Sequence, residues 1–208
     1  MSVDANSSKI EIAMLEKYEN LLHRLERLDP VCQALFCLAA SEHVIHVGDY
    51  LMGDTVLRDA LDKCWVIMAG KPIDQIRSLN DELYDKLPTI DEHAEYDLEK
   101  DTIVTCSLAI TQTIKCLQRE SGAVRMVFCT VYDILVGAWQ LVNPDCILED
   151  DPLETEAVAP RIFSGELQKI AALVDELDSG IPNDIGEWKI DQRIIGKDLS
   201  NQIEVLRA

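Results

Sequence analysis

Four residues whose types suit metal ligation or acid–base chemistry lie close together in the sequence: Glu42, His43, His46 and Asp49. His43, His46 and Asp49 follow one another at intervals of three residues, which places them near one face of a helix. Imidazole and carboxylate are ligand types that zinc and iron accept. The cluster is therefore a candidate metal-dependent catalytic centre.

A structural metal site, however, needs four ligands held by surrounding hydrogen bonds, and no second cluster in recognisable spacing supplies the missing partners. The alternative interpretation is a pair of half-exposed histidines near a helix end, where their protonated forms would favour the helix dipole. We favour this interpretation and predict no metal and no cofactor.

Signatures of other catalytic classes are incomplete. A di-iron bundle needs Glu-x-x-His on two helices, and the chain has no glutamate with a histidine three residues on. Gly196-Lys197 is followed by Asp198, where a phosphate-binding loop needs Ser or Thr. No Gly-x-Ser-x-Gly elbow is present. The sequence therefore predicts a protein that is not an enzyme.

Two acidic clusters lie in segments that we expect to connect helices. The first comprises Asp91, Glu92, Glu95, Asp97, Glu99 and Asp101, and the second Glu149, Asp150, Asp151, Glu154 and Glu156. Neither has the spacing of a calcium loop. Because loops often carry function, the second cluster is the predicted partner-binding site. The alternative is a solvated surface without a specific role.

The whole chain is strongly acidic, with 38 acidic residues against 19 basic ones and a formal net charge of −19. Such a field repels nucleic acids and anionic lipid heads, which bind through lysine and arginine. We therefore expect a basic protein partner, no nucleic acid and no membrane. The alternative is that the acidity serves only solubility.

The seven cysteines form no Cys-x-x-Cys pair. Most lie among aliphatic residues, where a reduced thiol packs as a small apolar side chain. The polar segment before Ser8 and the charges between Ile10 and Leu28 leave no signal-peptide core. These features predict buried, reduced cysteines and a cytoplasmic protein.

Apolar residues recurring every three or four positions predict an all-α fold. We expect one domain over residues 1–208, an antiparallel bundle of about seven helices. The expected helices begin after Ser7 or Ser8, after Asp29-Pro30 and after a cap at Asp54, and then cover Ile73–Leu87, Leu98–Arg119, Ala123–Val142 and Ile162–Leu177. The apolar helix at Ala123–Val142 must be surrounded by protein, since Arg125, Asp133 and Gln140 disfavour a lipid setting.

Three segments are expected to interrupt the bundle. Gly48 and Gly53 are predicted to bracket a break after the second helix. An acidic connection is expected around residues 143–160. The tail, residues 181–208, is predicted to be irregular, with one short helix at Leu199–Leu206.

The run His23–Leu28, then Phe36, then Leu57–Asp62 with Trp65, resembles the YjaG family of small bacterial proteins. Leu87-Pro88 and Tyr96 fall where that family has a comparable proline and tyrosine, so the resemblance covers about the first two-thirds of the chain. The chain departs from the family at His43, where the family has arginine. Since the family is all-helical and has no assigned activity, the resemblance implies a fold and no function.

Three hypotheses for function follow. The first is a non-catalytic binding protein, in its sharpest form an immunity protein or antitoxin that neutralises a basic toxin such as a nuclease. The second is an acidic housekeeping protein of the YjaG type that acts through a homodimer. The third is a metal-dependent enzyme that uses the cluster of Glu42, His43, His46 and Asp49.

Overall fold

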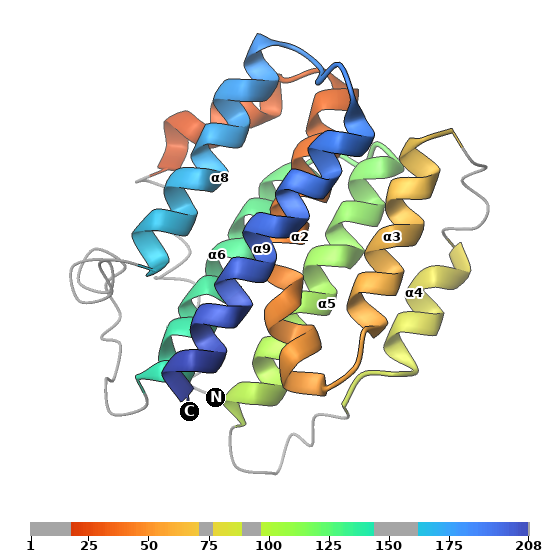
Figure 1. Cartoon of the computed structure of the whole chain (residues 1–208). Helices are drawn as coiled ribbons and strands as arrows, with labels where there is room; N and C mark the ends of the chain where they lie inside the picture. The colour runs from red at the N-terminus through yellow and green to blue at the C-terminus, as the bar shows by residue number, and fades with distance from the viewer. Residues whose placement is uncertain (1–17, 71–76, 89–96, 144–161, 208) are drawn as a thin grey trace, which may run out of the picture.

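The computed structural model describes residues 18–70, 77–88, 97–143 and 162–207, and within these ranges it contains helices and no strand (Figure 1). Its helices are α2 (Pro30–Met52), α3 (Val56–Met68), α4 (Arg77–Tyr84), α5 (Leu98–Leu117), α6 (Ala123–Val142), α8 (Ile162–Ser179) and α9 (Ile185–Arg207). Residues 18–27 form a further helical segment. The predicted all-α bundle is confirmed.

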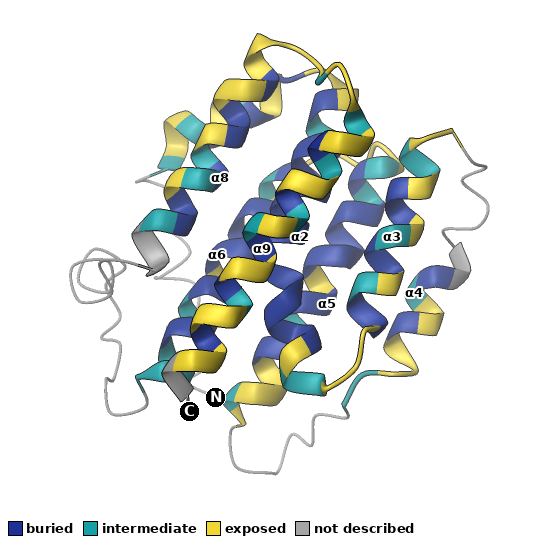
Figure 2. Ribbon diagram, viewed as in Figure 1, coloured by how far each residue is buried: buried dark blue, intermediate teal, exposed yellow. Residues whose placement is uncertain are grey.

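α2 is the central helix and packs against α3, α5, α6, α8 and α9. Every residue from Ala34 to Asp49 is buried, and Figure 2 shows α2 as an almost uninterrupted buried element. α9 lies along one side of α2, while α5 and α6 form a hairpin on another (Figure 1). Residues on α2 are therefore placed to contact most of the other helices.

The start of α2 agrees with the sequence, and its course beyond Gly48 does not. The Asp29 side chain accepts hydrogen bonds from the backbone N–H of Val31 and Cys32, and Pro30 occupies the first turn. The predicted break at Gly48 is wrong, because the helix continues to Met52. A Cβ at Gly48 would lie 2.4 Å from Leu57 Cδ1. Gly48 thus serves close packing of α3, and the helix ends at Gly53, whose φ is 64°.

The next two helices also differ in detail from expectation. Thr55, one residue after the expected cap, is the N-cap position of α3, while the Asp54 carboxylate accepts a hydrogen bond from the Thr55 N–H. α4 is shorter than the predicted Ile73–Leu87, since it ends at Tyr84. The beginning of that prediction, residues 73–76, lies outside the described residues, as does the first predicted helix up to residue 17.

α5 and α6 close the core as predicted. α6 has the expected bounds, and Gly122, with φ of 79°, makes the turn that precedes it. One hydrophobic cluster joins residues of α2, α3, α5, α6, α8 and α9. The cysteines at positions 32, 37, 64, 106, 116 and 129 are buried, which confirms the packing role predicted for them; Cys146 lies outside the described residues.

The prediction of an irregular tail is wrong. α9 runs from Ile185 to Arg207, and the Asp184 carboxylate caps it by accepting a hydrogen bond from the Glu187 N–H at 2.9 Å. Its buried stripe contains Trp188, Gln192, Gly196, Leu199 and Ile203. These residues have helical spacing, but two of them are not apolar, so the hydrophobic period is weak in the sequence.

Two described helices, α2 and α6, are long and apolar enough to cross a membrane by length and composition alone. In the structure 89% of the apolar window of α2 and 67% of that of α6 is buried inside the bundle. Packing against neighbouring helices therefore accounts for the apolar composition of both helices.

Candidate functional site

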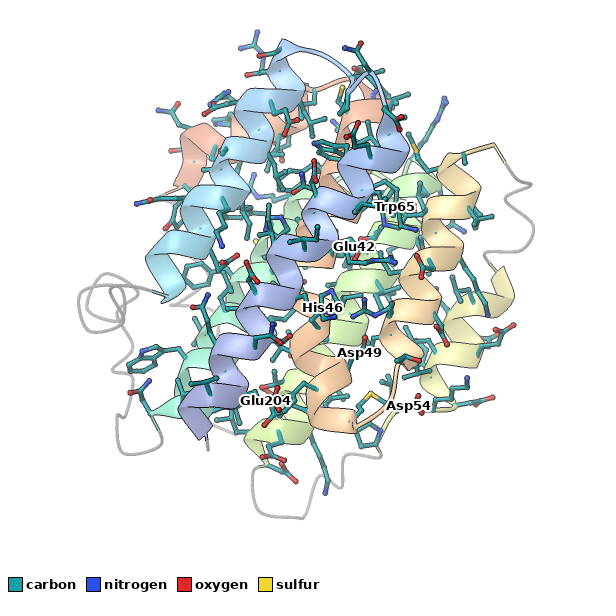
Figure 3. The ribbon with its side chains drawn as sticks, in the orientation of Figure 1. Glu42, His46, Asp49, Asp54, Trp65 and Glu204 are labelled. Carbon is teal, nitrogen blue, oxygen red and sulfur yellow. The ribbon has the colours of Figure 1, made fainter. Side chains whose placement is uncertain are left out.

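The four α2 residues singled out by their chemistry are all buried. His43 is 1% exposed and His46 is 4% exposed, and both lie within α2 rather than at its end. The interpretation of half-exposed, dipole-stabilised histidines is therefore wrong. Glu42, His46 and Asp49 follow one another along α2 between α9 and α3 (Figure 3). We call this buried polar contact of α2 with α3, α8 and α9 the polar seam.

The upper part of the polar seam is a charge pair between α2 and α9. Arg193 Nη2 donates to Glu42 Oε1 at 2.8 Å, and Arg193 Nε donates to Glu42 Oε2 at 3.2 Å. Trp65 Nε1 of α3 donates to the same Glu42 Oε1 at 2.8 Å. The Glu42 carboxylate, which is 0% exposed, therefore exchanges its hydration for three protein donors.

Asp62 of α3 extends this charge pair toward the surface. Arg193 Nη2 and Lys189 Nζ both donate to Asp62 Oδ1 at 2.6 Å. Partial burial would raise the pKa of Asp62, but the two cations outweigh it and hold that pKa below its usual value. The hydrogen bond to Glu42 raises the pKa of Arg193 further. Asp62 and Arg193 therefore stay ionised at pH 7.

Behind this pair, His43 faces α8 and α9. Its Nε2 lies 2.9 Å from Gln192 Oε1, an arrangement in which the imidazole N–H donates to the amide oxygen. Its Nδ1 lies 3.9 Å from Glu166 Oε2 of α8, and Lys169 pairs with the same carboxylate. Desolvation by burial lowers the pKa of His43 to about 4 and raises that of Glu166. His43 is therefore neutral at pH 7.

The lower part of the polar seam joins α2 to the start of α3. Asp49 Oδ1 accepts a hydrogen bond from the Leu57 N–H at 3.2 Å, while Thr55 makes no side-chain cap bond, so Asp49 caps α3 from the neighbouring helix. Arg58 contacts the His46 imidazole and lies 3.5 Å from Asp49 Oδ2. Desolvation, reinforced by Arg58, lowers the pKa of His46 to about 3. Burial raises the pKa of Asp49 to about 6.

These contacts account for the cluster in structural terms. Glu42 is bound to Arg193, His43 to Gln192, and Asp49 to the first turn of α3. In the part of the chain that the structure describes, no three His, Cys, Asp or Glu side chains form a group that could hold a metal ion. Spacing places the four residues on one helix, but their side chains are bound to residues of α3 and α9, and His46 and Asp49 share the cation Arg58.

The polar seam opens at its lower end into a pocket of about 370 Å³. His46, Asp49 and Arg58 form its inner wall, and Lys197 and Ser200 of α9 stand at its mouth. Arg58 and Lys197 could hold a small anionic or polar group by charge-assisted hydrogen bonds. Asp49 on the same wall opposes an anion, so the pocket has no clear charge preference.

The outer surface of the described residues carries many more exposed carboxylates than free cations. Ion pairs within the chain already hold Arg24, Arg58, Lys63, Lys100, Arg125, Lys169, Lys189 and Arg193. Exposed acidic side chains include Asp59, Asp81, Asp85, Glu120, Glu176, Glu187, Asp191, Asp198 and Glu204. The predicted partner-binding residues Glu149, Asp150, Asp151, Glu154 and Glu156 lie outside the described residues.

Sequence reasoning missed the partners of the α2 cluster. Arg193 and Gln192 lie in the segment expected to be irregular, and no polar contact was predicted for Asp62 or Trp65. A signal was present in the spacing of Trp188, Gln192 and Gly196, which share a helix face. It would have required polar residues and glycine to be counted as buried positions.

Comparison of the chain with family models, with curated proteins and with solved structures finds no match. The resemblance to the YjaG family therefore stays a prediction from the sequence.

Proposed function

We propose that this protein is a non-catalytic acidic binding protein that pairs with a basic protein. In its sharpest form it is an immunity protein or antitoxin that masks a cationic toxin such as a nuclease. The observation that carries the proposal is the distribution of charge. Within the described residues most basic side chains are held in ion pairs with the protein's own carboxylates, and the exposed carboxylates outnumber the remaining cations; the sequence as a whole has a net charge of −19.

The buried polar residues of α2 support this assignment because they hold the helices together. Glu42, Arg193 and Asp62 form a continuous set of hydrogen-bonded charges that join α2, α3 and α9. Burial lowers the pKa of both His43 and His46, so both imidazoles are neutral at pH 7. The chemistry-bearing residues of α2 thus serve the bundle, and the surface is the part of the molecule available to a partner.

An outward surplus of carboxylates has a kinetic consequence. Complementary charge steers the encounter of two proteins and raises the association rate more than the affinity. Salt screens this steering over about 8 Å at physiological ionic strength. The acidic run at residues 149–156 contributes five of the carboxylates in the sequence and stays part of the proposal through its charge.

The test is capture of the partner with the tagged full-length chain, followed by stopped-flow association of the purified pair. We expect a basic partner, association that slows as salt is added, and inhibition of the partner's activity at one-to-one stoichiometry. Reversal of Glu149, Asp150, Asp151, Glu154 and Glu156 to lysine should slow association further. A neutral or acidic partner, or an association rate indifferent to salt, would refute the proposal.

A further inference from the structure

α9 exposes large apolar side chains on the face that points away from α2. Ile190 is 58% exposed and Ile194 is 57% exposed, one helical turn apart. The buried residues Trp188, Gln192 and Leu199 lie on the opposite side of the same helix. The isoleucines are therefore held outward by the helix register rather than by a loose chain end. We call this surface the outer face of α9.

Carboxylates border the isoleucines along one edge of the helix. Glu187, Asp191 and Asp198 are all exposed, and helical spacing places them on the side of Ile190 and Ile194 that is turned toward α8. The other edge is turned toward α3 and carries Arg193 and Lys189, which are bound to Glu42 and Asp62, together with the exposed Lys197. An apolar centre with a charged border is the arrangement found at protein interfaces.

We propose that the outer face of α9, centred on Ile190 and Ile194, is the surface on which a basic protein partner docks, an inference that rests on the proposed function. The occupant is a protein segment with apolar side chains between lysines or arginines. A second copy of this chain is disfavoured, because in an antiparallel pairing of two α9 helices the acidic edge of one meets the acidic edge of the other. Anionic lipid is disfavoured by the same carboxylates.

A pair of cationic peptides tests the apolar centre with the full-length chain. The first is an amphipathic peptide of leucine and lysine; the second replaces its leucines with serines and keeps its charge. We expect the leucine peptide to bind the wild type about tenfold more tightly at moderate salt, because the isoleucines bury apolar surface. Fluorescence anisotropy of labelled peptide measures both affinities.

The variant Ile190→Ser/Ile194→Ser should lose most of that tenfold preference. The matched control is Val66→Ser/Met126→Ser, which removes two exposed apolar side chains from α3 and α6. The control should keep the preference. If both variants lose the preference for the leucine peptide equally, or if neither does, the outer face of α9 is not the docking surface. The proposed binding of a basic partner would still stand if both peptides bind the wild type.

Charge reversal tests the border. Glu187→Lys/Asp191→Lys should weaken binding of the leucine peptide more than Asp81→Lys/Asp85→Lys, a pair of equal charge on α4 and in the turn that follows it. Equal weakening would show that only net charge matters and would overturn the assignment to α9. Failure of the wild type to bind either peptide at low salt would instead refute the proposed function. Sedimentation that shows a dimer dispersed by Ile190→Ser/Ile194→Ser would replace the basic partner with a second copy.

Discussion

The inner and outer faces of α9 use related residue types in opposite ways. On the inner face, Arg193 is paired with Glu42, and Trp188 packs against Trp65 with ring centroids 6.3 Å apart. On the outer face, Ile190 and Ile194 stand in solvent beside Glu187 and Asp191. Charges and apolar groups that find partners inside the chain hold the bundle together. The same groups without internal partners stay available for another molecule.

The comparison predicts that inner-face changes alter stability and outer-face changes alter binding. The largest effect should come from Arg193→Ala, which leaves the buried Glu42 carboxylate with Trp65 as its remaining hydrogen-bond donor of the three. Removal of one partner of a buried pair costs about 3 kcal/mol or more. Urea unfolding followed by circular dichroism measures the loss.

Arg125→Ala is the control for that variant, because Arg125 pairs with Glu26 where both side chains are about one-third exposed. Its cost should stay below about 1 kcal/mol. If Arg193→Ala costs no more than Arg125→Ala, the polar seam does not hold α9 in place and the comparison of the two faces fails.

The second prediction concerns pH and His43, which is faced by Gln192, Glu166 and Lys169. Burial lowers the pKa of His43 from 6.5 to about 4, so between these values the unfolded chain binds a proton that the folded chain does not. The free energy of unfolding should therefore fall as pH decreases from about 6.5 to 4, by about 3 kcal/mol from this residue.

His43→Gln isolates that contribution, because it leaves the other titrating groups in place. His46 acts in the same direction, whereas Asp49, with its pKa raised to about 6, gains stability from acidification. Urea titrations at pH 4.5 to 7 should show that the free energy of unfolding depends less steeply on pH in the variant than in the wild type. Identical slopes in the variant and the wild type would mean that His43 titrates normally in the folded protein.

The third prediction tests how closely the inner face approaches α2. A Cβ at Gly196 would lie 2.0 Å from the Glu42 carbonyl oxygen, so Gly196→Ala should displace α9 and cost about 1–3 kcal/mol. Gly165→Ala, on α8, meets nothing within 4 Å and should be neutral or stabilising through helix propensity. Equal melting temperatures for the two variants would contradict the close contact.

The extent to which sequence foresaw this molecule follows from the same physics. α6 was predicted with its bounds because it is apolar nearly all round and follows the corner at Gly122, whereas α9 was missed because Gln192 and Gly196 interrupt its buried stripe. The cluster of Glu42, His43, His46 and Asp49 was found from local spacing. Its partners were not, since Arg193 is joined to Glu42 only by tertiary packing and no local pattern encodes that contact.

The smallest expected effect is the one that most sharply separates the two faces. Ile190→Ser and Ile194→Ser each remove a large apolar side chain, which in a core would cost several kcal/mol. Here both side chains are more than half exposed, and serine and isoleucine have similar helix propensities. Each change should therefore alter the free energy of unfolding by about 0.5 kcal/mol or less. Thermal and urea unfolding of the single variants, beside Leu199→Ser on the buried stripe, measures the contrast. Leu199→Ser should be strongly destabilising because that side chain is 0% exposed. A large loss at Ile190 or Ile194 would show that these residues pack within the protein, and the outer face of α9 would then belong to the fold rather than to a partner.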